Sequence, residues 1–563
     1  MPFKGPYPTV FGGNTPAMVI SATTFDGGVT NVGTIGSGGI SVIDSTFLSG
    51  GILDTGVITG GINIDSRSRI VGSGVSAVVI AATPTFGGGI TNSGTITTTK
   101  AGIFASSISI FAGGIDNRGA ISASLTAIGL HSISTFGGGI TNTGKITATA
   151  SGVAFDNIST FAGGITNRGA ISAGLAGIGV GVPGQLGVAT FLGGIVNSGT
   201  ISSASTGIRV VSTGVFSGGI VDSGTIFGSN GILVDSSGKI SGGIQVSTKG
   251  VVSAANAVVV ENTETFAGGI NNSGRIATGS AQAIMVTSLT EFDGGITNSG
   301  LVVGFGANPV ISVSLVTTFS GGIVNDTGGV VSGLPQLAHV IAANSIAVFS
   351  GGITNRGKLF GNGIDVESVT TFAGAISNAG VISAAGAGIV FKTGTVLGTS
   401  VGGNAVVNTG TISAILTGTG ISLASDTIVG NIINSGTISA SSTGLFVKAQ
   451  TFLGAISNSG KIAAHGQYGI LVRTVGSFGS DVSGGGITNT GVISGANNGI
   501  AVTSVTVFGN ASAGGGIVNS GTISAFNTDI RVGATTFSGG ISNASSGKIV
   551  STTGRGIFVG SPA

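Results

Sequence analysis

Carboxylate side chains offer this sequence its most direct route to chemistry, and only 18 Asp and Glu occur among the 563 residues. Paired carboxylates can work as general acid and general base, and enzymes that cleave polysaccharides use such pairs. The densest group is Glu261, Glu264, Glu291 and Asp293. We interpret this group as a solvated acidic strip that discourages lateral association, with a cation or catalytic site as the alternative.

The other charged residues form no recognisable catalytic or metal-binding set. A second group in an irregular stretch comprises Asp54, Asp65, Arg67 and Arg69, for which local ion pairing is the expected role. The three histidines, which lie far apart in the chain, are His131, His339 and His465. This separation argues against a metal triad and a Ser-His-Asp arrangement, so we expect no cofactor, no metal and no enzymatic activity.

Charge and composition exclude several classes of protein. The net charge is +2 and is spread thinly, whereas a nucleic-acid interface needs a clustered basic face. A modest basic edge of Arg118, Lys145 and Arg168 leaves an anionic glycan or surface as an alternative contact. Gly supplies 110 residues, but Pro supplies only 9 and no Gly-X-Y period exists, which excludes collagen. Because 41% of the residues are hydrophobic, the chain has ample surface to bury.

A repeated motif organises nearly the whole chain. Phe-x-Gly-Gly-Ile begins at Phe86, Phe111, Phe136 and Phe161, each 25 residues after the last, and recurs at Phe191 and Phe216. Close variants begin at Phe25 and Phe47. Each copy usually continues as Asn-x-Gly-x-Ile, and the matching asparagines are Asn92, Asn117, Asn142, Asn167 and Asn197.

The spacing within each copy indicates β-strands. The Phe and the two following Ile occupy even offsets, which is the period of a strand with one buried face, and no segment shows a helical period. Units of this length match one coil of a solenoid. The sequence therefore predicts an all-β fold, a single long parallel β-helix of about 21 coils of roughly 25 residues.

Stacking of such coils assigns structural roles to the repeated residues. Phe above Phe would form an aromatic ladder inside the coils, and Asn above Asn would let each side-chain amide bond the next. We expect a Pro-rich N-terminal segment or cap at residues 1–24, the β-solenoid repeat domain at 25–560 and a C-terminal tail at 561–563.

The repeats, in the form GGITNSGTISA, resemble passenger regions of bacterial autotransporters, the pertactin-like β-helices of Gram-negative surfaces. The resemblance runs from about Phe25 to Val559 and concerns the passenger region alone, since neither an N-terminal signal nor a C-terminal translocator barrel is recognisable. It implies a location outside the cell or on the bacterial surface, and roles in adhesion, aggregation or biofilm formation.

Three functions follow as hypotheses. The first is a non-enzymatic adhesive rod whose partners are other copies, cell surfaces or glycans, without nucleic acid and without a membrane span. The second is a filament subunit that stacks end to end through open terminal coils. The candidate end-to-end contact comprises Ile557, Phe558 and Val559. The third, a polysaccharide-active enzyme, needs an in-register carboxylate pair that the sequence does not reveal.

Overall fold

The computed structural model describes residues 9–10, 16–44, 46–335, 339–398, 400–479, 485–510 and 515–561. Strands make up 62% of the protein, and the described residues contain no helix. Parallel coils follow one another in about 20 turns spaced by about 26 residues, which confirms the predicted β-solenoid. The chain divides into two compact units, Met1–Gly268 with Gly274–Ala277, and Gly269–Ser273 with Thr278–Ala563.

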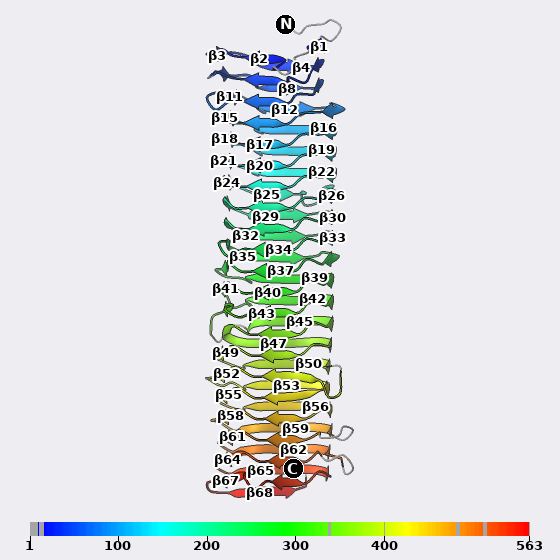
Figure 1. Ribbon diagram of the computed structural model, residues 1–563, viewed down its shortest axis with the longest axis vertical. Coiled ribbons are helices and arrows are strands. Elements are labelled where there is room, and N and C mark those ends of the chain that lie inside the picture. The colour runs from blue at the N-terminus through cyan, green and yellow to red at the C-terminus, as the bar shows by residue number, and fades with distance from the viewer. Residues whose placement is uncertain are drawn as a thin grey trace. The chain divides into compact units, whose positions relative to one another are not determined.

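A regular coil of the first unit contains three strands. β20 (Ile140–Asn142) and β21 (Lys145–Ala148) are short, and β22 (Val153–Phe161) is long. Each strand pairs in parallel with its equivalents in the coils before and after it, so that β17 (Ile115–Asn117), β20 and β23 (Ile165–Asn167) lie one above the next (Figure 1). The register places identical residue types above each other, as in Ile115, Ile140 and Ile165.

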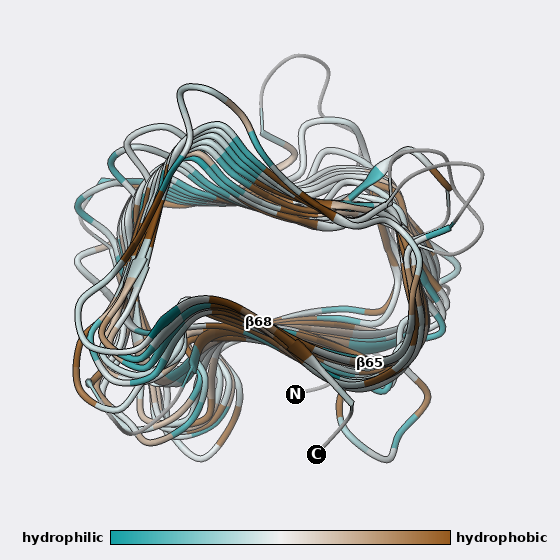
Figure 2. Ribbon diagram, turned by 90° about the horizontal axis from the view of Figure 1, so that it is seen from below, coloured by the Kyte–Doolittle hydropathy of each residue, from teal (hydrophilic) through white to brown (hydrophobic). Residues whose placement is uncertain are grey.

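Alternating burial along the strands builds the core. In β20 the outer Thr141 lies between the buried Ile140 and Asn142. Hydrophobic and hydrophilic residues therefore gather into bands that recur from coil to coil (Figure 2). The corner after each Phe has no room for side chains, because a Cβ on Gly138 would overlap the backbone of Gly113 in the preceding coil. This close approach explains the paired glycines of the repeat.

The long strand is bent by one residue in the left-handed region. In β22 that residue is Asn157, with φ of 51°, and in β19 (Ile128–Phe136) it is Ser132, with φ of 53°. Both side chains point outward, and the amide of Asn157 donates a hydrogen bond to the hydroxyl of Ser132 at 2.8 Å. Non-glycine residues rarely adopt this conformation, so the bend is specified by the surrounding coils and not by local preference.

The earliest coils depart from the predicted register. Phe25 pairs with Leu48, not Phe47, and Leu48 pairs with Ile70, which belongs to the column of Ile96. The column of Phe86 is instead continued by Ile58 and Ile35. Phe25 and Phe47, which begin close variants of the motif, therefore lie outside the column of Phe86. The physical reason is that the same Phe-x-Gly-Gly motif forms a different corner here, the one that leads to Val29, Ile52 and Val78.

The second unit repeats the three-strand coil, with one long strand in each coil. Those strands are β39 (Ile284–Phe292), β42 (Ile311–Phe319), β45 (His339–Phe349), β47 (Lys358–Phe372), β50 (Ile389–Leu397), β53 (Ile421–Val429), β56 (Leu445–Leu453), β59 (Tyr468–Phe478), β62 (Asn498–Phe508) and β65 (Thr528–Phe537). Each is hydrogen-bonded in parallel to the next, and β65 is followed by β68 (Arg555–Gly560).

The predicted terminal segments are only partly described. Within residues 1–24, positions 1–8 and 11–15 lie outside the described residues, as do positions 562–563 of the expected tail. The described strands β1 (Thr9–Val10) and β2 (Met18–Ile20) pair in parallel with β5 (Thr34–Ile35) and β6 (Ile40–Val42).

Candidate functional site

A column of side-chain amides runs through the interior of the first unit. Each amide nitrogen donates to the side-chain oxygen of the next coil, at 2.7–2.8 Å, from Asn92 through Asn117, Asn142, Asn167 and Asn197 to Asp222. These side chains are almost fully buried. A buried amide without such partners would cost about 1–3 kcal/mol, so the column is a structural element and not a reactive one.

Asp222 occupies the last position of this column because the next coil offers Val246 in its place. An Asn here would present an amide with no acceptor above it, whereas a carboxyl accepts from Asn197 at 2.7 Å and need donate nothing. Burial raises the pKa of Asp222 to about 6, although hydrogen bonds from Asn197 and from the backbone of Gly224 and Val251 oppose the shift.

A column of phenyl rings accompanies the amides. Ring centroids of consecutive coils lie 4.7–5.1 Å apart from Phe86 through Phe111, Phe136, Phe161 and Phe191 to Phe216. Ile240 takes the next position above Phe216. All six rings are buried, so they serve packing and are not available to stack against a ligand.

The predicted acidic group is divided between the two units. Glu261 and Glu264 belong to the first unit and Glu291 and Asp293 to the second. Asp293 accepts a hydrogen bond from the hydroxyl of Ser320 at 2.8 Å. Glu261 lies opposite Asp235 of the preceding coil, a neighbour that its position in the sequence does not suggest. Burial, reinforced by the charge of Asp235, raises the pKa of Glu261.

The charged residues of the irregular stretch have separate surroundings. Asp54 is buried and accepts from the amide of Asn31 at 2.7 Å. Asp65 accepts from the backbone nitrogens of Arg67 and Ser68, at 3.1 and 2.9 Å, and so closes a turn. The guanidinium of Arg69 lies 5.8 Å from the ring centroid of Phe47. Each therefore contributes locally to the coil that contains it.

A charged cluster that sequence reasoning missed lies on three consecutive long strands of the second unit. The ammonium of Lys392 on β50 lies 3.1 Å from the carboxylate of Glu367 and 3.5 Å from that of Asp365, both on β47. His339 of β45 lies 3.6 Å from Asp365. Asp365 and Glu367 are two residues apart on one face of a strand, and this spacing is the signal that could have found them.

Electrostatics limit what this cluster can do. Burial lowers the pKa of His339 and outweighs the attraction of Asp365, so the imidazole is neutral at pH 7. Partial burial alone would lower the pKa of Lys392, but the hydrogen bond to Glu367 and the charge of Asp365 raise it. A lysine held protonated between two carboxylates is an ion-pair donor and not a general base.

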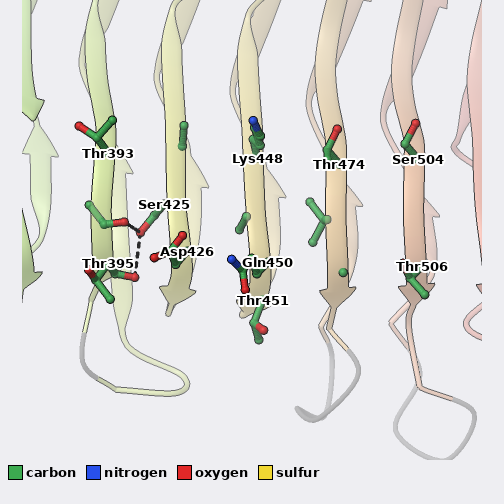
Figure 3. Close-up of a pocket in the computed structure, with 15 residues that line it drawn as sticks. Thr393, Thr395, Ser425, Asp426, Lys448, Gln450, Thr451, Thr474, Ser504 and Thr506 are labelled. Carbon is green, nitrogen blue, oxygen red and sulfur yellow. Dashed lines mark hydrogen bonds between the residues drawn. The ribbon is translucent and has the colours of Figure 1, made fainter. Parts of the chain in front are cut away.

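An elongated groove lies next to this cluster on the same series of strands. It has a volume of about 910 Å³ and is lined by residues of β50, β53, β56, β59 and β62 (Figure 3). Hydroxyl groups of Thr393, Thr395, Thr451, Thr474 and Thr506 border it. Asp426, Lys448 and Gln450 border it too, and their side chains have no hydrogen bond or ion pair within the described part of the chain.

The groove exists because two coils are one residue shorter than their neighbours. The chain advances eight residues from Ile389 to Leu397 but seven from Ile421 to Ile428, and the pairing register shifts at this point. β53 and β56, both fully described, therefore have no left-handed residue at the bend, whereas Thr393, Thr474 and Ser504 have φ of 54–55°. The outward bulge is missing over two coils.

Small side chains form the base of the groove. Where other coils bury Ile, Leu or Val after the bend, these coils bury Ser425 and Ala449, and β50 has Gly394. The hydroxyl of Ser425 donates within the protein, to backbone oxygens that include those of Gly394 and Thr395, at 3.1 and 3.3 Å (Figure 3). The shortened spacing and the small residues are both readable in the sequence once the coils are aligned.

The candidate end-to-end residues lie on β68, whose described pairing is with β65. Ile557 and Val559 are about half exposed, at 46% and 54%. Phe558 packs against two guanidinium groups, with the Cζ of Arg555 4.9 Å and that of Arg531 5.8 Å from its ring centroid.

Within the ranges that the structure describes, no cluster of three or more His, Asp or Glu could hold a metal ion, and no helix is long and apolar enough to cross a membrane. Comparison with protein-family models, with curated proteins and with solved structures gives no match.

Proposed function

We propose that the protein is a non-enzymatic extracellular β-solenoid that serves structure and adhesion at a bacterial surface. The observation that carries the proposal is the in-register repetition of small hydroxyl side chains on the outer face. In the first unit Thr97, Ser122, Thr147, Ser172 and Ser202 are aligned on five consecutive coils. Weak contacts repeated along such a column add up to strong attachment through multivalency.

Inward-facing and outward-facing side chains have different roles within each coil, and this difference supports an adhesive function. Inward positions hold the amide and phenyl columns, so the outward positions are free to vary without loss of the core. The GGITNSGTISA repeats resemble those of autotransporter passenger regions, and this resemblance supports a location outside the cell.

The test is attachment of protein-coated beads to bacterial cells, to glycan-coated surfaces and to glass. Removing the hydroxyls of one column by the combined substitutions Ser122→Ala, Thr147→Ala and Ser172→Ala should reduce attachment severalfold without changing the fold. The matched control substitutes Thr91→Ala, Thr141→Ala and Thr166→Ala on the shorter strands. Beads that attach to none of these surfaces, or turnover of a polysaccharide by the protein, would contradict the proposal.

Within the described residues β68 is paired on one side only, which favours a second candidate, a subunit that stacks end to end. Its outer backbone groups and the half-exposed Ile557 and Val559 present a strand edge of the kind that pairs with another chain. Sedimentation velocity over a range of concentrations tests this candidate. Growth that Val559→Lys abolishes would support it, and a fixed size at all concentrations would refute it.

A further inference from the structure

We infer that the groove on β50, β53, β56, β59 and β62 of the second unit binds a neutral linear glycan. The groove crosses five parallel strands, which are spaced about 4.8 Å apart in such sheets, so it extends about 19 Å from the first strand to the last. Its volume of about 910 Å³ lies at the upper end of the range of small-molecule sites. An extended chain of several sugar units matches this shape better than a compact metabolite does.

The lining supplies the hydrogen-bonding groups that sugar hydroxyls need. Threonine hydroxyls both donate and accept, and they stand along the groove on four of the five strands. The carboxylate of Asp426 accepts and the ammonium of Lys448 donates, while the amide of Gln450 does both. Because these three side chains have no partner in the described part of the chain, a ligand can bond them without first breaking a protein contact.

The floor permits close approach of a flat ring. Gly394, Ala424, Ala449 and Gly476 line the groove and carry at most a methyl group as side chain. The neighbouring bulges at Thr393 and Thr474 rise on either side of the two short coils. A sugar ring can therefore lie against the sheet while its hydroxyls reach the walls.

Charge favours a neutral ligand. The lining contains one carboxylate and one ammonium group, which cancel. At the end nearest β47, Lys392 precedes Thr393 but is already paired with Asp365 and Glu367. A single free lysine is too little for nucleic acid or for a polyanionic glycan, both of which need several phosphate- or carboxylate-binding cations.

A peptide fits the groove less well than a glycan. Peptides that bind sheets usually add a strand to a free edge, and every strand that lines this groove is paired on both sides. These strands therefore offer no free edge for such pairing. A lipid chain would leave the hydroxyl and charged groups along the groove without hydrogen-bond partners.

A neutral linear glycan would be the ligand in the adhesive role proposed above. Only the biological context of the binding depends on that role. Binding is measured on the purified chain by titration calorimetry, with linear neutral hexasaccharides of glucose, mannose, xylose and N-acetylglucosamine. Parallel titrations use a galacturonic acid hexasaccharide and an unstructured Gly/Ser-rich peptide. We expect saturable binding of at least one neutral hexasaccharide, and of neither the acidic one nor the peptide.

Two groove variants locate the site. Asp426→Ala should weaken binding about tenfold, since a hydrogen bond to a charged group is lost. Ala424→Trp should abolish binding by filling the groove, because Ala424 points outward and not into the core. The matched control is Ala347→Trp, which places the same ring on an exposed alanine of β45 outside the groove.

The outcomes separate this inference from the proposed function. Binding that Ala424→Trp removes and Ala347→Trp retains would support the inference. Binding unaffected by Ala424→Trp, binding of the acidic hexasaccharide or the peptide instead, or binding of no neutral hexasaccharide would overturn it. Bead attachment that persists in the Ala424→Trp variant would still support the adhesive role, so the two proposals fail independently.

Discussion

At the scale of single residues, the buried carboxyl of Asp222 couples the stability of the first unit to pH. Its pKa is raised to about 6 from an ordinary value of 3.8, because burial penalises the charged form. The folded state therefore holds this proton more tightly than the unfolded state does. Protonated Asp222 therefore contributes to the free energy of unfolding. This contribution is full below about pH 4 and is lost as the pH rises through about 6, on the order of 2–3 kcal/mol in all.

Substituting Asp222→Asn should reduce the pH dependence of the first unit, and Asp54 and Glu261, whose pKa values burial also raises, should retain part of it. The amide keeps an oxygen for Asn197 and carries no charge, but its nitrogen has no side-chain acceptor in the next coil, so the variant should match the wild type at pH 7 and be less stable than it at pH 4. Thermal unfolding followed between pH 4 and 8 checks this. Asp529 of the second unit, whose pKa burial also raises to about 6, should leave a residual slope. Identical slopes in both proteins would contradict the assignment.

At the scale of the strand columns, the Phe column should tolerate changes of shape better than loss of volume. The ring of Phe136 lies 4.9 Å from that of Phe111 and 4.7 Å from that of Phe161. The same column accepts Leu397 and Ile428 in the second unit, where they stack between Phe372 and Phe452. Large aliphatic side chains therefore fit between the coils.

We expect Phe136→Leu to cost about 1 kcal/mol and Phe136→Ala about 3–5 kcal/mol of the free energy of unfolding. The larger loss arises because alanine leaves a cavity between two rings that stay in place. Chemical denaturation measures both values, with Leu125→Ala as the control, since Leu125 is 49% exposed. Equal losses for the two Phe136 variants would show that aromatic contacts, and not volume, stabilise the column.

The strand columns also show how far the sequence predicts this fold. Exact 25-residue repeats from Phe86 to Phe161 fix the coil and its inward residues, because a period of two leaves one buried face. Phe25 and Phe47 begin similar motifs outside the Phe column, because one corner motif serves two corners and only strand pairing distinguishes them. Local motifs specify a corner, but the register depends on contacts between coils.

The groove and the complete charged cluster become recognisable only after the coils are aligned, although the two-residue spacing of Asp365 and Glu367 is visible in the sequence itself. Asp365 and Lys392 meet only because consecutive coils stack, and residues so far apart in the chain show no local spacing that joins them. The missing residue at the bend of β53 is visible only after Ile421 and Ile428 are aligned with Ile389 and Leu397. Departures from the repeat therefore mark the places where a solenoid acquires individual sites.

At the scale of the whole molecule, each coil contacts the coils beside it, so damage to one coil should spread only to its neighbours. Asn142 accepts from Asn117 at 2.7 Å and donates to Asn167 at 2.8 Å. Substituting Asn142→Ala leaves a buried donor and a buried acceptor unpaired, which should cost about 2–4 kcal/mol. Thr141→Ala, one position away on the outer face, should change stability by less than about 0.5 kcal/mol.

Hydrogen exchange distinguishes a local effect from a global one. In Asn142→Ala, amides of β17, β20 and β23 should exchange faster, because these strands carry the interrupted amide column. Amides of β31 (Ile220–Asp222) and β34 (Ile244–Val246), several coils away in the same unit, should keep their protection. A uniform loss of protection over the first unit would show instead that its coils unfold as one cooperative body, and that the amide column couples them over its whole length.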